Sequence, residues 1–234
     1  MIFRIDTEDT VLPSPEWSED DGLLAVGGSL DPDLMIRAYS RGIFPWYSFE
    51  ESPEPLWYGP SQRFVIFPEE IHVSHSMRQL INSGRLRCSI NEDFEGVVRG
   101  CSEVDGRRGL EGAWLGDEMI QTMLILHERG CATSVEVWED GRLVGGLYGV
   151  DRGLIDIPDG ALFVGESMFS RRPSASKMAL IHLAREMQKY GGKIIDCQFE
   201  TPHLRSMGGR HIPYAEYMTT VGGDPTLPYS EISQ

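Results

Sequence analysis

Residues Leu143 to Phe199 decide the fold, and they read LVGGLYGV, DRGLIDIPDG, ALFVGESMFS, RRPSASKMAL, IHLAREMQKY and GGKIIDCQF in succession. This order predicts a glycine-interrupted strand, a turn-rich loop over 151–160, a second strand, an amphipathic helix from near Ser174, and a last strand over 193–199. The helix carries its apolar side chains on one face at a spacing of about 3.6 residues: Ala179, Leu180, Leu183, Ala184 and Met187. Because glycine weakens a strand, we expect a bulge or a close backbone approach where glycines interrupt the first one.

The last predicted strand places one carboxylate and one amide on the same face. Side chains alternate along a strand, so Ile194, Asp196 and Gln198 face one way and their neighbours face the other. A carboxylate in the middle of an apolar strand is costly to bury unless hydrogen bonds satisfy it. Asp196 is therefore either a structural anchor or a reagent, and the spacing alone does not decide between the two.

The length of 234 residues allows a sizeable core, built as one large domain or as a main domain with a smaller appendage. The four cysteines contain no C-x-x-C pair. Neither a charged leader nor an apolar run of about 18 residues is present. We therefore expect a reduced, soluble, cytoplasmic protein that does not enter a membrane.

The formal net charge of −15 argues against a broad basic surface for nucleic acid. The charge is uneven, because residues 163–210 hold eight Lys or Arg and four Asp or Glu, a net +4 that leaves −19 for the remainder. Either the acidic body only keeps the protein soluble, or it attracts a cationic substrate while the basic region holds a phosphate-bearing one.

Residues 1–62 are acidic and punctuated by prolines, and we expect them to form a small N-terminal unit. Asp31 begins a predicted helix that ends at Gly42. Large aromatic residues follow within a short distance: Phe44, Trp46, Tyr47, Trp57 and Tyr58. Beside so many prolines and glycines they cannot all lie on one regular element, so they belong either to the core or to a stacking surface at a cleft.

From residue 63 onward the pattern predicts strands over 63–67 and 86–90, helices over 74–83 and 117–128, and a hairpin around Asp140-Gly141. With the helix and strand described above, this order predicts an α+β fold. A small N-terminal α/β unit over 1–62 precedes a domain over 63–234 that is similar to N-acetyltransferases (GNAT-like), with a splayed mixed sheet. The loop over 151–160 is expected to be exposed.

A coenzyme-A-dependent N-acetyltransferase is the alternative function that such a fold suggests. That coenzyme needs a glycine-rich turn at a helix start, where backbone amides hold the pyrophosphate. Here the corresponding place, 170–177, contains no glycine, which disfavours acetyl-coenzyme A, although its three cations suit phosphate. A serine hydrolase fails, because Phe169 stands where a G-x-S-x-G elbow around Ser167 needs its second glycine.

Several motifs in one order resemble the leucyl/phenylalanyl-tRNA-protein transferase family over about residues 13–217. They are FPWYS at 44–48, LVGGLYG at 143–149, GESMFS at 165–170, ASK at 175–177 and IDCQ at 195–198. The resemblance implies a bacterial cytoplasmic aminoacyltransferase that moves Leu or Phe, with Met a plausible third, from aminoacyl-tRNA to proteins with N-terminal Arg or Lys. Such transfer marks those proteins for degradation in the N-degron pathway.

The same resemblance implies neither a metal nor a cofactor, and we expect a monomer. Two further classes of function remain open beside it, namely the N-acetyltransferase and a tRNA-binding or adaptor module without activity. The chain departs from the family pattern at Ala113, Met123 and Thr133, which leaves adenosine contacts near Met123 open.

The resemblance also assigns the site. Asp196 and Gln198 are the implied catalytic pair, and Glu166 is the implied partner of the α-amino group of the transferred residue, unless it is an ordinary surface ion-pair residue. The implied side-chain pocket has residues that would serve a plain core equally well: Leu147, Phe163, Met168, Leu180, Leu183, Met187 and Ile195. Phe44, Trp46 and Trp114 are implied to contact the terminal adenosine. From charge, we expect Arg171, Arg172 and Lys177 to meet tRNA phosphates.

An aminoacyl ester is already activated, so attack by an amine needs positioning and help in losing a proton. We expect Gln198 to hold the amine by a hydrogen bond while Asp196 polarises or orients Gln198. Alternatively, both residues only position the substrates and the tRNA ribose relays the proton.

Overall fold

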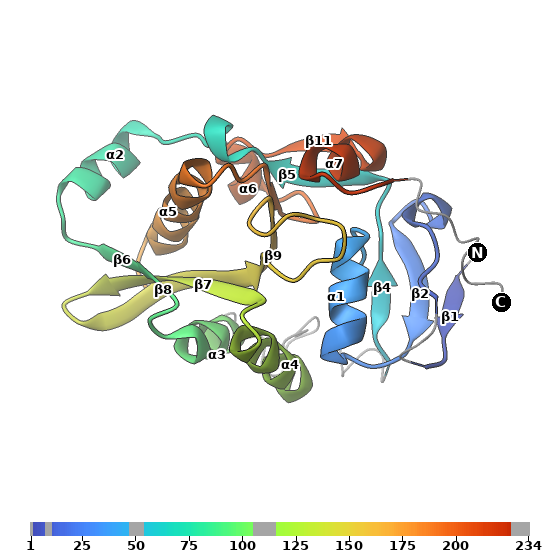
Figure 1. Ribbon diagram of the computed structural model, residues 1–234. Coiled ribbons are helices and arrows are strands. Elements are labelled where there is room, and N and C mark those ends of the chain that lie inside the picture. Colours follow the sequence, from blue (N-terminus) through green and yellow to red (C-terminus); the bar gives the residue numbers. More distant parts are fainter. Residues whose placement is uncertain (1, 8–10, 47–53, 105–115, 226–234) are drawn as a thin grey trace.

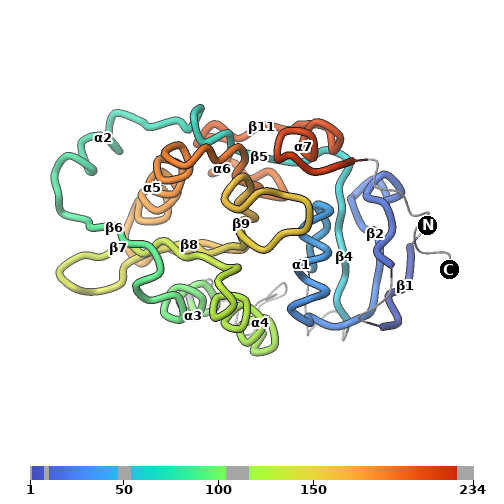
Figure 2. The backbone as a smooth tube through the Cα atoms, viewed as in Figure 1, coloured from blue at the N-terminus to red at the C-terminus, as the bar shows by residue number. Residues whose placement is uncertain are grey.

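The computed structural model describes residues 2–7, 11–46, 54–104 and 116–225, and its strands form two sheets (Figure 1). The N-terminal sheet has four strands in the spatial order β1 (Phe3–Ile5), β2 (Leu23–Gly27), β4 (Leu56–Tyr58) and β3 (Phe44–Trp46). The large sheet has seven strands in the order β11 (Arg210–Pro213), β5 (Gln62–Ile66), β10 (Ile194–Asp196), β9 (Leu162–Ser170), β8 (Arg142–Val150), β7 (Ala132–Glu139) and β6 (Arg87–Ile90). The chain passes from β4 almost directly into β5, which joins the two sheets (Figure 2).

The large sheet is mixed. Within it β9 and β10 run parallel, and the other neighbouring strands run antiparallel. The helices are α1 (Pro32–Ser40), α2 (His75–Asn82), α3 (Phe94–Val104), α4 (Asp117–Glu128), α5 (Ala175–Lys189), α6 (Pro202–Ser206) and α7 (Tyr214–Val221), with 3-10 turns η1 (Pro15–Trp17) and η2 (Pro68–Glu70). None of the described helices has both the length and the apolar character that crossing a bilayer requires.

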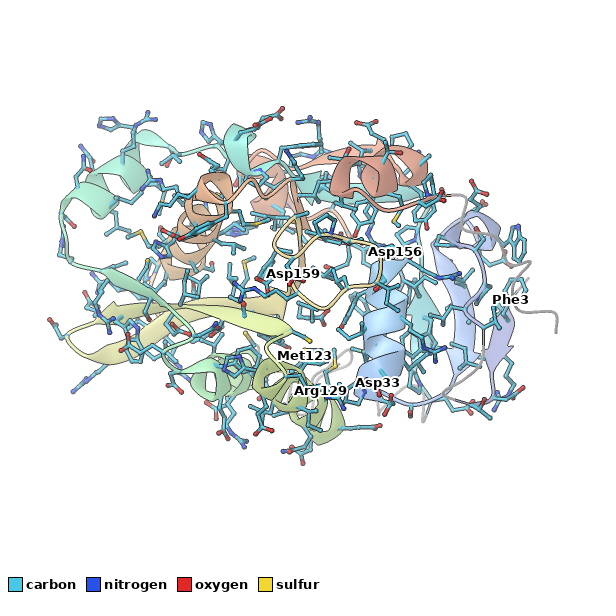
Figure 3. The ribbon with its side chains drawn as sticks, viewed as in Figure 1. Phe3, Asp33, Met123, Arg129, Asp156 and Asp159 are labelled. Atoms are coloured by element: carbon cyan, nitrogen blue, oxygen red, sulfur yellow. The ribbon has the colours of Figure 1, made fainter. Side chains whose placement is uncertain are left out.

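The helices cover both faces of the large sheet (Figure 1). One buried cluster lies on the side of α3 and α4 and also includes residues of α1 and α7, so the N-terminal sheet and the large sheet share apolar packing. A second cluster lies beneath α5, whose apolar face is buried as its 3.6-residue period predicts. The exposed pair Arg129 and Asp33, 2.6 Å apart, links α4 to α1, and Met123 of α4 is fully buried (Figure 3).

Helix α1 forms where the sequence predicts it. The Asp31 side chain accepts hydrogen bonds from the backbone N–H groups of Asp33 (2.8 Å) and Leu34 (3.1 Å), which satisfies two donors at the helix start. The chain leaves the helix through Gly42, whose φ of 67° is readily adopted by glycine. Tyr39, in the last turn, is completely buried.

The glycines of β8 are sites of close approach, as predicted. A Cβ on Gly145 would lie 2.5 Å from the Cβ of Ala175, so this glycine lets α5 pack directly on the strand. A Cβ on Gly149 would overlap the carbonyl oxygen of Val164, next to a register shift between β8 and β9.

The sheet opens between β9 and β10. Strand β10 pairs with β9 only over 194–196 and 162–164, whereas β9 continues to Ser170 paired with β8 alone. Beyond Asp196 the chain turns away at Gln198, which has a left-handed φ of 56°. The unpaired part of β9 and the departing chain thus form a fork in the sheet.

Most residues of the loop over 151–160 are exposed, as predicted, but two of its apolar residues are buried. Leu154 and Ile157 are only 7% and 5% exposed, and the backbone N–H of Ile155 donates to the Ser40 hydroxyl at 2.7 Å. The predicted turns form, but the two buried apolar side chains between them belong to the buried cluster on the side of α3 and α4. The loop therefore ties the large sheet to α1.

Candidate active site

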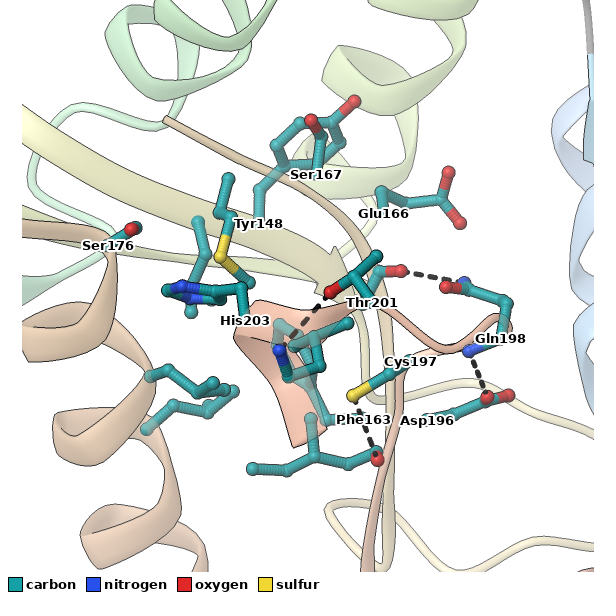
Figure 4. A pocket seen from close by; sticks show the side chains of 17 residues that line it. Tyr148, Phe163, Glu166, Ser167, Ser176, Asp196, Cys197, Gln198, Thr201 and His203 are labelled. Carbon is teal, nitrogen blue, oxygen red and sulfur yellow. Dashed lines mark hydrogen bonds between the residues drawn. The ribbon is translucent and has the colours of Figure 1, made fainter. Parts of the chain in front are cut away.

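A cavity of about 410 Å³ occupies the fork in the sheet (Figure 4). Its wall is largely apolar and comes from β8, β9, β10, α5 and α6. Of the predicted pocket residues, the structure brings six to this wall: Leu147, Phe163, Met168, Leu180, Leu183 and Ile195. Met187 is not among the lining residues, because it lies a turn further along α5 and is buried beside Gly192.

A second cavity of about 270 Å³ adjoins the first. Residues that line both cavities include Glu166, Met168 and Gln198, so the two cavities adjoin at these residues. Its other wall holds an aromatic group: the Phe199 ring lies 5.4 Å from Phe44, 5.7 Å from Trp46 and 5.8 Å from Tyr58, measured between centroids.

Trp46 is 37% exposed, so an aromatic face is accessible from outside. Phe44 and Trp46 therefore line a cavity, as a stacking surface requires, although Phe44 is itself buried. Trp114 lies outside the described residues.

The Asp196 carboxylate is completely buried and saturated with hydrogen bonds. Arg63 Nε lies 2.9 Å from each of its oxygens, and Arg63 Nη2 lies 2.7 Å from Oδ2. The Tyr217 hydroxyl donates to Oδ2 at 3.0 Å, and the backbone N–H of Gln198 donates to Oδ1 at 2.9 Å. Arg63 also donates through Nη1 to the carbonyl oxygen of Gly42 at 2.7 Å. The hydrogen bonds that burial of this carboxylate requires are therefore supplied within the fold.

Gln198 does not share a strand face with Asp196, and that prediction was wrong. Strand β10 ends at Asp196, and the left-handed conformation of Gln198 breaks the alternation on which the prediction depended. The Gln198 side chain lines both cavities, and its Nε2 donates to the carbonyl oxygen of Gly165 at 2.6 Å (Figure 4). This bond orients the amide group, whose oxygen is an acceptor.

Glu166 stands where the two cavities meet, and its Oε1 is shielded from solvent without a hydrogen-bond partner among the described residues. Burial raises the pKa of Glu166 to about 7. The Tyr39 hydroxyl and Arg63 oppose this rise, and the Asp196 carboxylate adds to it. A cationic group of a ligand would relieve the cost of ionising this buried carboxyl group.

Comparisons with known proteins show the family of this chain. The family model described as "Leucyl/phenylalanyl-tRNA protein transferase" matches residues 65–222, and the model of its N-terminal domain matches residues 28–61. The chain belongs to this family. A member from Edwardsiella ictaluri (strain 93-146) is 44% identical over 219 residues, which cover 93% of this chain and 85% of that protein. One from Anaeromyxobacter sp. (strain Fw109-5) is 44% identical over 94% of this chain and 89% of that protein.

The comparison with solved structures includes distant matches. A ribosomal-protein-alanine N-acetyltransferase from Brucella melitensis biovar Abortus 2308 has 12% identity and a TM-score of 0.34, over 51% of this chain and 85% of that one. This likeness supports no conclusion about the leucyl/phenylalanyl-tRNA protein transferase fold.

In this transferase-family chain, the three predicted phosphate-contacting cations have different surroundings. Arg171 lies 3.1 Å from Glu103, and Arg172 lies 2.8 Å from Glu139, in partly exposed ion pairs. Lys177 follows Ser176, which lines the large cavity. Of these three cations, Lys177 is therefore the nearest in sequence to a residue that lines the cavity.

Reasoning from the sequence missed several residues of the site. Arg63 and Tyr217 hold Asp196 from elements 133 and 21 residues away, and no local pattern signals such contacts. His203 also lines the large cavity, and its buried Nε2 makes no hydrogen bond within the described part of the chain. Burial, with Lys177 adding to the effect, lowers the pKa of His203, which favours the neutral imidazole.

Two of the residues at which this chain departs from the transferase family pattern, Met123 and Thr133, are described by the structure, and neither lines the two cavities. Met123 is buried in the core, and the Thr133 hydroxyl donates to Asp151 at 2.9 Å. Ala113 lies outside the described residues. Across the described ranges, no group of three or more His, Cys, Asp or Glu is arranged to hold a metal ion.

Proposed function

We propose that this protein moves Leu or Phe, with Met a plausible third, from aminoacyl-tRNA to the N-terminal amine of an acceptor protein. The observation that carries the proposal is the pair of joined cavities, one apolar and one aromatic, which meet at Glu166 and Gln198. An aminoacyl-adenosine end consists of an apolar side chain and a flat base joined at an ester beside an α-ammonium group. The two cavities and the polar groups between them match those parts in kind and in order.

The apolar cavity suits the side chain of the transferred residue. Five apolar residues of its wall, Leu147, Phe163, Leu180, Leu183 and Ile195, suit a leucine- or phenylalanine-sized guest. Glu166 would bind the α-ammonium group and so fix where the side chain enters. A guest branched at Cβ would clash close to the backbone, which accounts for Leu and Phe over Val and Ile.

The aromatic cavity suits the terminal adenosine. Stacking of a base on an aromatic side chain is worth about 1–3 kcal/mol and does not depend on the identity of the tRNA. Trp46 and Phe44 are the described residues proposed to make this contact, together with Trp114. Arg171, Arg172 and Lys177 are proposed to contact phosphates. The two arginines would have to leave acidic partners in partly exposed ion pairs, and surface pairs contribute only about 0–1 kcal/mol.

The chemistry needs positioning more than a strong base. The amine nitrogen attacks the ester carbonyl carbon, the C–N bond forms, the bond to the ribose oxygen breaks, and one proton passes from the amine to that oxygen. Gln198 is proposed to accept a hydrogen bond from the attacking amine. Asp196 acts as a positioning residue, since Arg63, Tyr217 and the Gln198 N–H already occupy its oxygens. The ribose itself then relays the proton.

The large sheet with its fork supports the finer assignment of a GNAT-like transfer domain over 63–234, preceded by a small unit over 1–62. The coenzyme-A alternative is less well supported. At the start of α5 the Ser170 hydroxyl already accepts the N–H of Ser176 at 2.8 Å, and Ser174 has a left-handed φ of 72°. A pyrophosphate would have to displace this bond. We propose that the acceptors are proteins with an N-terminal Arg or Lys, which the transfer marks for degradation. We also propose that the enzyme is monomeric and cytoplasmic.

The test uses tRNA charged with labelled leucine and two peptides that differ only in an N-terminal Arg or Ala. We expect label in the Arg peptide, little in the Ala peptide, and a loss of more than about tenfold in single-turnover rate for Gln198→Ala, which corresponds to ~1.4 kcal/mol. Glu118→Gln, a change on the exposed surface of α4, is the matched control and should transfer normally. Absence of transfer to the Arg peptide by the unmodified protein, together with saturable binding of acetyl-coenzyme A, would overturn the proposal.

A further inference from the structure

Two hydroxyl groups next to Glu166 are buried without partners. Tyr39 of α1 and Tyr148 of β8 are both 0% exposed, and neither hydroxyl makes a hydrogen bond to any residue that the structure describes. The Oε1 atom of Glu166 is also shielded from solvent and has no hydrogen-bond partner among the described residues. Buried polar atoms are almost always paired in folded proteins, so these three atoms, like the Nε2 atom of His203 at the large cavity, need an explanation.

The three atoms are close enough to act on one another. The Glu166 carboxylate and the Tyr148 hydroxyl both contribute to raising the pKa of Tyr39, after burial itself, and the Tyr39 hydroxyl in turn lowers that of Glu166. In Figure 4 the Glu166 carboxylate points away from the apolar end of the cavity, toward the blue ribbon of the N-terminal unit to which α1 belongs. An ionised carboxylate accepts hydrogen bonds only, and a neutral phenol can donate one.

We propose that Tyr39 is a positioning residue that holds Glu166 through its hydroxyl, so that the carboxylate can receive the α-ammonium group of the residue being transferred. This inference rests on the proposed function and adds a residue of the N-terminal unit to it. No hydrogen bond joins the two groups in the structure, but ionisation of Glu166, whether by a rise in pH or by the arriving cation, lets the Tyr39 hydroxyl donate to the carboxylate. The ammonium group and Tyr39 then together satisfy atoms that are otherwise buried without partners.

Tyr148 does not carry the same role. Its ring packs edge-on against Phe94 at 6.0 Å, and Cys101 contributes more than Glu166 to raising the pKa of its hydroxyl. Among the groups that shift the pKa of Glu166 are Tyr39 from α1, Arg63 from β5 and Asp196 from β10, but not Tyr148. Tyr148 is thus a buried, unpartnered hydroxyl at the same cavity that should have little influence on Glu166, which makes it a matched control.

The test compares Tyr39→Phe with Tyr148→Phe, since each change removes one oxygen and keeps the ring. In the substrate-free protein, carbon-13 NMR titration of labelled glutamate side chains should show the Glu166 resonance titrating at a pH higher by about half a unit or more in Tyr39→Phe, and unchanged in Tyr148→Phe. Glu166→Gln assigns the resonance. Thermal unfolding of all variants at one pH confirms that they are folded.

Kinetics supply the second measurement. In Tyr39→Phe the acidic limb of kcat/KM for Leu-tRNA should move to higher pH, and KM near neutral pH should rise about three- to tenfold. Identical titration and pH profiles for Tyr39→Phe and the unmodified protein would overturn this inference while leaving the proposed function intact. Lack of transfer by the unmodified protein would overturn the proposed function, whereas the NMR titration would still report whether Tyr39 acts on Glu166.

Discussion

Replacing Glu166 by Gln should stabilise the protein, and the gain should grow with pH. The carboxyl group has an ordinary pKa of 4.5, and burial raises the pKa of Glu166 to about 7 in the folded protein. Between these two values the folded protein binds more protons at this position than the unfolded chain does. The contribution of Glu166 to stability therefore becomes less favourable as pH rises through this window, and Gln, which does not titrate, removes the dependence.

The size of the effect follows from the pKa difference. One pKa unit corresponds to ~1.4 kcal/mol, so ionised Glu166 costs the folded state about 3 kcal/mol once both states have lost the proton. The linkage relation places the penalty below about 1 kcal/mol at about pH 5 and near about 3 kcal/mol at about pH 8. The free energy of unfolding of Glu166→Gln, minus that of the unmodified protein, should therefore increase by about 2–3 kcal/mol across this range.

Urea unfolding followed by circular dichroism at several pH values measures this difference. Titration of all other groups cancels in the subtraction, provided that the variant keeps its fold. Glu118→Gln, on the exposed surface of α4, serves as the control for the exchange of Glu for Gln itself. Parallel pH–stability curves for Glu166→Gln and the unmodified protein would show that burial imposes no such electrostatic cost on the Glu166 carboxyl group.

Three further predictions concern the ion pair, the stacking surface and the pocket. Arg63→Met leaves the Asp196 carboxylate buried without its charge partner and should cost about 3–5 kcal/mol in urea unfolding, with recovery in the double variant Arg63→Met/Asp196→Leu if the loss is electrostatic. Trp46→Ala removes a stacking contribution of about 1–3 kcal/mol and should raise KM for aminoacyl-tRNA by about 5- to 150-fold in steady-state assays. Because the ring is partly exposed, the midpoint temperature of thermal unfolding should change by no more than about a degree or two. Leu183→Phe should narrow the cavity and shift competition between Leu-tRNA and Phe-tRNA toward Leu by about tenfold; an unchanged ratio would place Leu183 outside the pocket.

Local patterns predicted the elements whose signals are local. The N-cap at Asp31 and the apolar period of α5 depend on residues within one or two turns, and both elements form as expected. The same period placed Leu180 and Leu183 on the face that turns toward the sheet, where they line the cavity. The sequence pattern could not distinguish such a wall from a filled core, because both need apolar side chains at the same spacing.

Features that depend on distant parts of the chain could not be predicted. The environment of Asp196 is set by Arg63 and Tyr217, which reach it from separate elements. The end of β10 and the left-handed conformation of Gln198 depend on where β9 stops pairing, not on the residues themselves. The buried apolar residues in the loop over 151–160 likewise need α1 as a partner, and turn signals carry no information about it.

A short segment of the N-terminal unit, residues 39–46, supports every part of the proposed site. The Tyr39 hydroxyl lowers the pKa of Glu166, and the carbonyl oxygen of Gly42 accepts a hydrogen bond from Arg63 Nη1. Phe44 and Trp46 line the aromatic cavity. Arg63 connects these contacts, because its guanidinium lies 4.6 Å from the centre of the Phe44 ring while it binds Asp196. A displacement of this segment would therefore change the aromatic cavity, the orientation of Gln198 and the environment of Glu166 together. Under the proposed function the N-terminal unit thus contributes to the site, although Glu166 and Gln198, the groups proposed to lie next to the ester, both come from the large sheet and the segment that follows it.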